Sequence, residues 1–474
     1  MRRETTRRVA LLVAGIVVLT GVLVADAVVG PSAPKSNGAP PPSAVLSDAA
    51  ATSSAWYCPG LAAVAGAVLI TNPGRVPVTG TVRSQPAGSS TVTTTRFAAP
   101  PSQQVAVDLP QGAATVSVEG GGVGVLEAVV GAFGVTASPC ASSAASAWYF
   151  AQGSTANGAG MEVAVFNPLP TPAVVDISFT SPTTGTIVPP AYQGVPLAPG
   201  QSVVENVMDH APGQGSLATA VTALSGSVVA TVFEPSSGPG HGGSSFLDGT
   251  TAPRPLWAFA QNQDVAGGTN YFVMYNPTSV PATVTVSLAL TQGQAAPIVV
   301  PLPPQSTSVL TAESQTRIPT GAAYGIVFST NSRSQSSAAG IVVARLAISN
   351  GSPNPAVGVS SGQAGGFSRW LVAPVAPGQS PAGLAVIDLT TRPVRVTVKG
   401  FQSSAGPTAL PGAKNIKVDP GTVYMLSSSP ATPVGWSPVE VEASGPVAVQ
   451  LDPSPADPPG TAPVVAWPLL SQLG

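Results

Sequence analysis

Two histidines, His210 and His241, are the side chains best suited to metal binding or acid–base chemistry. His210 lies in VMDHAPG and His241 in GPGHGGSS, so with Asp209 and Asp248 they could form a weak metal or acid–base site. Both histidines occupy turns rich in Gly and Pro, where solvated loop side chains are the favoured interpretation. The sequence therefore nominates no metal ligand.

Other patterns that support catalysis are missing from the sequence. There is no G-x-S-x-G turn, no H-E-x-x-H helix and no phosphate-binding glycine loop that opens a helix. Glu440 and Glu442 in VEVEA share one face of a predicted strand, and we expect that face to be an exposed edge rather than a pair of catalytic carboxylates. We predict no catalytic residue and no cofactor.

Two cysteines, Cys58 and Cys140, complete the reactive side chains. In an oxidising compartment an even pair suggests one disulfide. That bond would close a loop of about 80 residues, which a chain-entropy treatment values at about 4 kcal/mol. Two buried free thiols are the alternative. Zinc is disfavoured, because the whole chain has only two histidines.

Tryptophan marks an internal repeat. The four residues concerned begin similar segments, SAWYCPG, SAWYFAQG, PLWAFAQN and SRWLVAPV, and are Trp56, Trp148, Trp257 and Trp370. Exposed tryptophans at these places could stack on sugars. A tryptophan that recurs inside an apolar strand is more often a core anchor, which is the interpretation we favour.

A turn follows each tryptophan at a nearly constant distance. Its first residue lies 16, 19, 19 and 18 positions further on, and the four residues are Asn72, Asn167, Asn276 and Asp388. A proline follows five positions later in all four segments. Asn and Asp can bond to their own backbone and tolerate left-handed conformations, while the proline ends ladder hydrogen bonding. The fixed step predicts a tight reversal in every repeat.

Alternating β-branched runs such as VVDISF and TVTVSL follow these turns and predict half-buried strands. Each unit contains five to seven short strands and no convincing helix, which is the rhythm of a small antiparallel β-sandwich. We predict an all-β chain, a tandem array of four β-sandwich repeats after an N-terminal transmembrane helix. The expected repeats span residues 55–142, 146–250, 253–366 and 367–474.

The N-terminus predicts export. Four arginines among the first eight residues precede an uncharged apolar run from Val9 to Ala25, so residues 1–30 are expected to form a signal anchor with its N-terminus inside. An A-x-A pattern at Ala25 and Ala27 leaves open cleavage near Ala27 and secretion. Residues 31–54 are rich in Pro, Ala and Ser and are expected to be a semi-rigid spacer.

Composition excludes several classes of protein. Only 8% of the 474 residues are charged and the net charge is -2, so a nucleic-acid partner is not expected. The 51 glycines and 52 prolines exclude a long helical bundle, because proline breaks the helical hydrogen-bond ladder. At 44% hydrophobic residues, the chain still has enough apolar surface to fold.

Two resemblances add to this interpretation. The segment AWYFAQGSTANGAGMEVAVFNPLPTPAVVDISF resembles the β-sandwich of the sensory-rhodopsin transducer family, although the Glu of that family's opening motif is Gln152 or Gln261 here, or absent. The anchor, the WYCPG opening at Trp56 and the paired Cys140 resemble an actinobacterial family of secreted proteins of unknown function. This second resemblance implies location and architecture and transfers no catalytic residue.

Together these features predict a non-enzymatic, extracytoplasmic cell-envelope protein with a structural or binding role. The expected partners are the membrane, through the N-terminal helix, and cell-wall glycan or envelope proteins. A transducer module that binds a small carbohydrate is the alternative, and an envelope hydrolase is the least favoured one.

Overall fold

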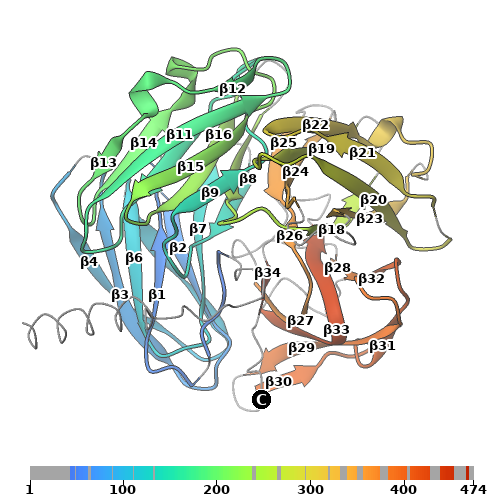
Figure 1. Cartoon of the computed structure of the whole chain (residues 1–474). Helices are drawn as coiled ribbons and strands as arrows, with labels where there is room; N and C mark the ends of the chain where they lie inside the picture. Colours follow the sequence, from blue (N-terminus) through green and yellow to red (C-terminus); the bar gives the residue numbers. More distant parts are fainter. Residues whose placement is uncertain are drawn as a thin grey trace, which may run out of the picture. The chain divides into compact units, whose positions relative to one another are not determined.

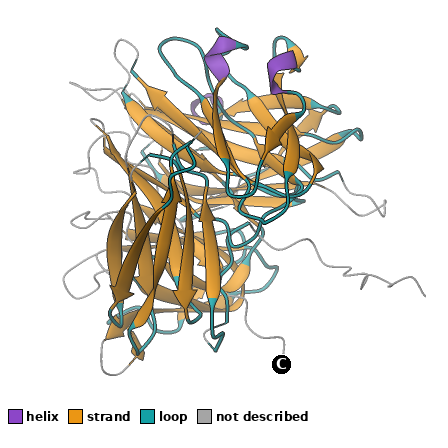
Figure 2. Ribbon diagram, turned by 90° about the vertical axis from the view of Figure 1, so that its left-hand side faces the viewer, coloured by secondary structure: helices purple, strands orange, loops and turns teal. Residues whose placement is uncertain are grey.

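The described part of the chain is all-β, as predicted. The computed structural model describes residues 43–48, 50–61, 66–87, 89–109, 111–131, 134–237, 242–263, 268–293, 295–318, 321–330, 339–349, 356–373, 383–402, 406–427, 438–452 and 466–468. Apart from strands and loops, these residues contain three short 3-10 turns, a class of element drawn in purple in Figure 2: η1 (Pro190–Tyr192), η2 (Val207–Asp209) and η3 (Ala312–Ser314). The predicted anchor over residues 1–30 lies outside the described residues.

No helix among the described residues is long and apolar enough to span a bilayer.

Residues from Pro41 onward form one compact unit, whose strands make four sets of sheets that we call repeats 1 to 4 (Figure 1). Repeat 1 contains β1 (Ser54–Cys58), β2 (Gly66–Asn72), β3 (Val78–Gln85), β4 (Thr93–Ala99), β5 (Gln103–Leu109), β6 (Ala113–Glu119), β7 (Gly124–Gly131) and β8 (Gly134–Pro139). Repeat 2 contains β9 (Ala147–Phe150), β10 (Glu162–Phe166), β11 (Ala173–Ser181), β12 (Gly185–Ile187), β13 (Val195–Leu197), β14 (Ser202–Asn206), β15 (Ala218–Ser225), β16 (Val229–Ser236) and β17 (Gly243–Asp248).

The second half of the chain continues the same series. Repeat 3 contains β18 (Leu256–Gln263), β19 (Gly268–Asn276), β20 (Ala282–Leu290), β21 (Ile298–Leu302), β22 (Ser306–Thr311), β23 (Ala323–Thr330), β24 (Val342–Ser349), β25 (Ala356–Ser361) and β26 (Gln363–Ala364). Repeat 4 contains β27 (Phe367–Val372), β28 (Gly383–Asp388), β29 (Val394–Gln402), β30 (Gly406–Ala409), β31 (Ile416–Val418), β32 (Val423–Ser427), β33 (Val439–Asp452) and β34 (Ala466–Pro468).

One two-sheet topology recurs in repeats 1 to 3. In repeat 1 the strand that carries the tryptophan lies in a sheet of order β1-β6-β3-β4, and the strand that ends in asparagine lies in a second sheet of order β5-β2-β7-β8. Repeat 2 reproduces this arrangement as β9-β15-β11-β12 and β14-β10-β16-β17. All the ladder pairs are antiparallel. Antiparallel strands can be joined by short loops, so the short connections of this chain are compatible with these sheets.

Repeat 4 departs from this scheme at one strand. β33 is 14 residues long and pairs with β29 through its first half, with β27 mainly through its first half and with β28 through its second half. The two sheets of repeat 4 are therefore continuous and form one eight-stranded sheet. In the first three repeats the corresponding segment is divided between two strands, as in β6 and β7.

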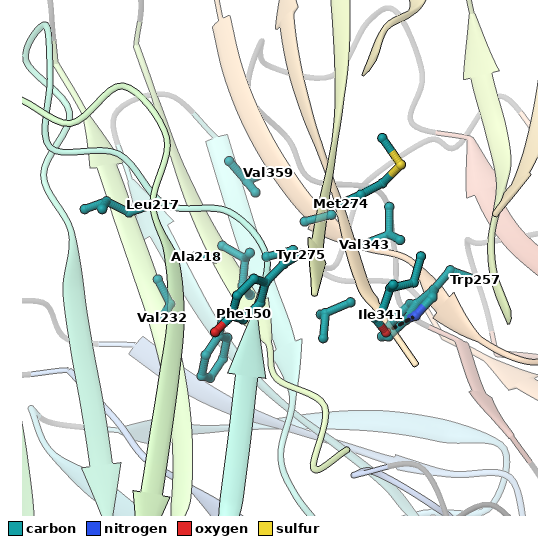
Figure 3. Packing of buried hydrophobic residues seen from close by; sticks show 14 of the residues in the cluster. Phe150, Leu217, Ala218, Val232, Trp257, Met274, Tyr275, Ile341, Val343 and Val359 are labelled. Carbon is teal, nitrogen blue, oxygen red and sulfur yellow. Dashed lines mark hydrogen bonds between the residues drawn. The ribbon is translucent and has the colours of Figure 1, made fainter. Parts of the chain in front are cut away.

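The cores extend beyond single repeats. One cluster of buried side chains joins repeats 2 and 3, including Phe150 and Val232 with Trp257, Met274 and Val359 (Figure 3). Repeats 1 and 2 share a smaller cluster of Leu61, Val129, Phe233 and Phe246. Because apolar burial is roughly proportional to the area removed from water, these shared clusters stabilise the repeats against separation.

Two further clusters connect repeat 4 to its neighbours. Ala385 and Ile387 pack with Ala258 and Ala260 of repeat 3. Leu371 and Ala373 belong to the core cluster of repeat 1, although they are separated from it by more than 200 residues of sequence. Each repeat thus shares apolar packing with two others.

The expected spacer over residues 31–54 is wrong at its C-terminal end. Ala44 and Leu46 are buried in the core cluster of repeat 1, and the Ser142 N–H donates to the Ser43 carbonyl at 3.1 Å. Composition could not reveal this, because two alternate apolar residues in a Pro/Ala/Ser segment are too few to form a pattern.

Candidate functional site

The four recurring tryptophans are core residues. Their exposed fractions lie between 1% and 3%, for Trp56, Trp148, Trp257 and Trp370. The faces of these rings are therefore covered by protein and are not available as platforms for sugar stacking. The core-anchor prediction is confirmed, and these tryptophans give no support to the carbohydrate-binding alternative.

In repeats 2 to 4 the indole N–H of the tryptophan donates to an equivalent backbone carbonyl. Trp148 Nε1 donates to the Val228 carbonyl at 2.8 Å. Trp257 Nε1 donates to the Ile341 carbonyl at 2.7 Å, a bond drawn in Figure 3. Trp370 Nε1 donates to the Val447 carbonyl at 3.0 Å. The Val447 residue lies opposite Asp388 in the β28–β33 ladder. The indole therefore binds the strand that pairs with the strand leading to the recurring Asn or Asp. In this way the recurring tryptophan and the recurring Asn or Asp are connected through one strand.

The side-chain amide of the recurring asparagine clamps two turns together. In repeats 1 to 3 its Nδ2 donates to one carbonyl four residues ahead and to two carbonyls near the start of a later turn. The acceptors are Val76, Ala99 and Pro100 for Asn72; Thr171, Leu197 and Ala198 for Asn167; and Val280, Leu302 and Pro303 for Asn276. The Oδ1 atom accepts the backbone N–H two residues ahead, from Gly74, Leu169 or Thr278.

The predicted bond of Asn to its own turn is thus confirmed, but the left-handed conformation falls elsewhere. None of the clamp residues has a positive φ. The later turn has the left-handed residue in every repeat, each directly after a proline: Ser102, Gly200, Gln305 and Gly421, with φ between 48° and 76°. A type II turn favours proline at its second position and requires a positive φ at the third, which is the position of these residues.

The clamp is altered in repeat 4, where Asp388 replaces asparagine. Asp388 Oδ1 accepts the Thr390 N–H at 2.7 Å, as the asparagine oxygen does elsewhere. Oδ2 is buried and has no hydrogen-bond partner among the described residues. A carboxylate oxygen cannot donate, so it cannot satisfy the carbonyls that the Nδ2 group serves in the other repeats.

The two cysteines form the predicted disulfide. Cys58 at the end of β1 and Cys140 just after β8 are bonded across a sequence separation of 82 residues. Because β1 and β8 belong to different sheets of repeat 1, the bond joins both layers of that sandwich. Both residues are buried in its core.

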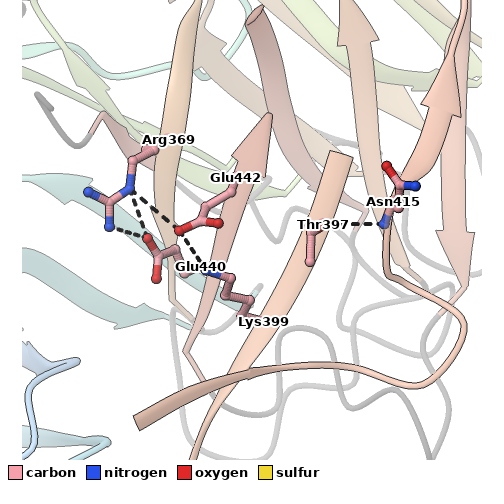
Figure 4. Close-up of polar contacts among 6 residues, drawn as sticks. All are labelled: Arg369, Thr397, Lys399, Asn415, Glu440 and Glu442. Carbon is pink, nitrogen blue, oxygen red and sulfur yellow. Dashed lines mark hydrogen bonds and ion pairs between the residues drawn. The ribbon is translucent and has the colours of Figure 1, made fainter. Parts of the chain in front are cut away.

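The Glu440–Glu442 pair is not on an exposed edge, which corrects the expectation from the sequence. Both residues lie on β33, which has paired strands on both sides, and Glu440 is 4% exposed. Arg369 contacts Glu440, and Lys399 Nζ lies 2.6 Å from Glu442 Oε1 (Figure 4). The two acids are therefore neutralised by cross-strand bases, which is a structural arrangement rather than a catalytic dyad.

Two acids that the sequence gave no reason to single out, Glu127 and Glu234, are buried near the contact of repeats 1 and 2, and the half-buried Asp248 lies close to Glu127. Burial raises the pKa of Glu127 to about 7, while an N–H from Gly60 acts in the opposite direction. Burial also raises the pKa of Glu234 to about 8, and it raises that of Asp248. Glu127 and Asp248 line one cavity of about 10 Å³, room for about one water molecule. The only sequence signal is an acid within an apolar run.

The histidines do not assemble a metal site in the part of the chain that can be described. His241 lies outside the described residues. His210 packs edge-on against the Tyr192 ring, with centroids 4.8 Å apart. Among the described residues no group of three or more His, Cys, Asp or Glu side chains could hold a metal ion.

Comparison with known proteins shows the family of this chain. No curated protein matches the chain. A solved structure, the crystal structure of Thermotoga maritima 1070, is 14% identical, with a TM-score of 0.21, and the match covers 23% of this chain and 94% of that one. A family of unknown function, DUF5719, matches residues 124–429, from β7 to just past β32 and thus more than half of the sequence. The WYCPG opening precedes the matched region. The chain belongs to the family of unknown function DUF5719.

Proposed function

We propose that this chain is a non-enzymatic, extracytoplasmic cell-envelope protein that serves as a structural or binding scaffold. One observation carries the proposal: the residue types that recur in every repeat are used inside the fold. The tryptophans fill cores, and the asparagines bond to backbone carbonyls. Repetition that maintains a framework is typical of a protein whose role is to hold or present surfaces.

The disulfide supports the extracytoplasmic part of this proposal. Structural disulfides persist in oxidising compartments and are rare in the cytosol of mesophiles. The arginine-rich N-terminus and its apolar run support the same location, with the membrane as partner and cell-wall glycan or envelope proteins as the binding partners. We also carry into this proposal the narrower resemblance to actinobacterial secreted proteins with a WYCPG opening.

Protease accessibility in whole cells tests the location. We expect an impermeant protease to digest the full chain in intact cells of the producing organism, with a cytoplasmic protein as the protected control. Degradation only after lysis would overturn the location.

Cosedimentation of the purified chain with isolated cell walls tests the binding role. An unrelated protein of similar size and net charge is the control for nonspecific retention. If neither cell walls nor cross-linked envelope proteins retain the folded chain, the binding role is wrong.

A further inference from the structure

The edge strand β4 of repeat 1 differs from the equivalent edge strands of the other repeats. β4 lies at the end of its sheet and pairs with β3 alone among the described strands. It has seven residues, TTTRFAA, none of which is proline. The equivalent edge strands of repeats 2, 3 and 4 have five residues or fewer, and three of them contain proline, at Pro196, Pro301 and Pro407.

This difference affects how the edges can pair. A free edge presents unpaired N–H and C=O groups, and proteins commonly block it with short strands, proline or charge. Proline cannot donate to a ladder, so the edge strands of repeats 2 to 4 that are equivalent to β4 are poor templates for another strand. β4 is long, rich in β-branched threonine and exposed at five of its seven positions. Among the four equivalent edges, it is the one best suited to accept an added strand.

A groove lies beside this edge. It has a volume of about 460 Å³ and is lined by residues 95–98 of β4 and 105–108 of β5. Both strands are at the edge of their sheets. Phe97 and Val107 are each 8% exposed and give the groove an apolar floor. The exposed Arg96 forms none of the ion pairs found among the described residues.

We propose that β4 binds an extended peptide segment of another protein by β-strand addition, with an acidic residue of the peptide opposite Arg96. Successive residues of a strand point to opposite faces. The peptide residues on either side of the acid would therefore cover the apolar groove, so the preferred ligand alternates apolar, acidic and apolar residues. Main-chain hydrogen bonds supply the affinity in this mode, and alternate side chains supply the specificity.

A second copy of the chain is the less suitable occupant. Arg96 is the central residue of the seven in β4. Full-length antiparallel pairing of β4 with β4 of a second copy would therefore place Arg96 opposite Arg96. Like charges directly opposite each other destabilise a cross-strand pair. A peptide with an acidic residue opposite Arg96 forms an attractive cross-strand pair instead.

This inference rests on the binding role proposed above but can fail independently of it, because it is tested with peptides and not with cell walls. The probe is a fluorescently labelled nonapeptide of alternating Thr and Val with Asp at its centre. The matched probe has Lys at the centre. Fluorescence anisotropy with the full chain should show about tenfold tighter binding of the Asp peptide, because an attractive cross-strand pair replaces a repulsive one.

Two changes separate the parts of the interaction. Arg96→Glu should reverse the preference to the Lys peptide, while Arg75→Glu, an exposed control in the same repeat, should leave it unchanged. N-methylation of alternate peptide nitrogens on the bonding edge should weaken binding more than tenfold, since it removes the main-chain donors. Thermal denaturation of each variant verifies that it is folded.

Several outcomes would overturn the inference. Equal binding of the Asp and Lys peptides, or a preference for the Asp peptide that survives Arg96→Glu, would show that Arg96 does not recognise the charge of the peptide. Binding that is insensitive to N-methylation would exclude strand addition. A dimer of the chain that competes with the peptide would show that a second copy occupies the edge. Any of these results would leave the location and the cell-wall experiment unaffected.

Discussion

The asparagine clamp shows how a single side chain can connect two turns. Its amide donates to three carbonyls in each of the first three repeats, and its oxygen fixes the local turn. Buried carbonyls without a donor are costly, since an unsatisfied buried polar group costs about 1–3 kcal/mol. Asp388 cannot make these bonds in repeat 4. The carbonyls of Arg392 and Asp419 accept threonine hydroxyls instead, and Asp388 Oδ2 has no hydrogen-bond partner among the described residues.

We therefore expect Asp388→Asn to stabilise the protein. The new amide would donate to the carbonyls around Asp388 and remove a buried oxygen that has no partner, a gain of about 1 kcal/mol. Urea denaturation at neutral pH measures the change. The reciprocal control, Asn276→Asp in repeat 3, should lose at least as much. A lower stability for Asp388→Asn would show that the carboxylate has a role that the clamp does not explain.

The tryptophans permit a matched comparison of the same kind. Trp148→Phe removes the bond to the Val228 carbonyl and part of the ring. Trp56→Phe removes a similar part of the ring, but Trp56 Nε1 has no acceptor among the described residues. We expect Trp148→Phe to be the more destabilising by about 1 kcal/mol, the net value of one hydrogen bond. Equal losses, measured by urea denaturation, would mean that ring packing alone decides the cost.

At the scale of the elements, much of the architecture could be predicted from the sequence. The positions of the tryptophans, the turn residues and the cysteines follow from residue type and spacing. The partners of these residues do not, because no sequence pattern identifies which carbonyl receives Nδ2 or Nε1. The left-handed turn residue was also missed, since Ser102 and Gln305 occupy a position where glycine would have been recognisable.

Packing between strands of different repeats was beyond sequence reasoning for a similar reason. β17 lies beside β8 and β25, and the Phe246 N–H donates to Thr136 Oγ1 at 3.0 Å. The Val359 N–H donates to Ser245 Oγ at 2.7 Å. Serine and threonine are abundant in this chain, so these particular ones carry no signal. The burial of Glu440 was missed likewise, because its cover comes from residues distant in sequence.

The disulfide is an element-scale constraint, because it joins two sheets. We expect reduction, or Cys58→Ser with Cys140→Ser, to destabilise repeat 1 by about 4 kcal/mol, since the unfolded chain regains the freedom of a loop of 82 residues. Guanidinium denaturation with and without reductant measures this loss, and the reductant should have no effect on the double-serine chain. Alkylation of both cysteines in the native, unreduced protein would contradict the bond itself.

For the whole molecule, the buried acids predict how stability depends on pH. Glu127 has a pKa of about 7 in the folded chain and an ordinary value of 4.5. Between these two values the unfolded chain has released the proton and the folded chain retains it. The free energy of unfolding therefore falls as pH rises through this window, by about 3 kcal/mol in total. Glu234 extends the loss towards pH 8.

Thermal denaturation between pH 4.5 and pH 8 measures this effect. Glu127→Gln should flatten the pH dependence, because the amide does not titrate. Glu119→Gln, an exposed substitution in the same repeat, should not flatten it. A midpoint temperature that rises with pH over this range, or an unchanged slope in Glu127→Gln, would show that the buried carboxyl is charged in the folded protein.

The packing of Leu371 and Ala373 into the core of the first repeat has a consequence for how such a chain can evolve. In an open repeat protein, units contact only their nearest neighbours, so gene duplication can add or delete one without disturbing the rest. Here the last unit is also a neighbour of the first. Loss or gain of a unit by recombination would leave apolar surfaces unmatched, and selection should hold the copy number of this lineage at four.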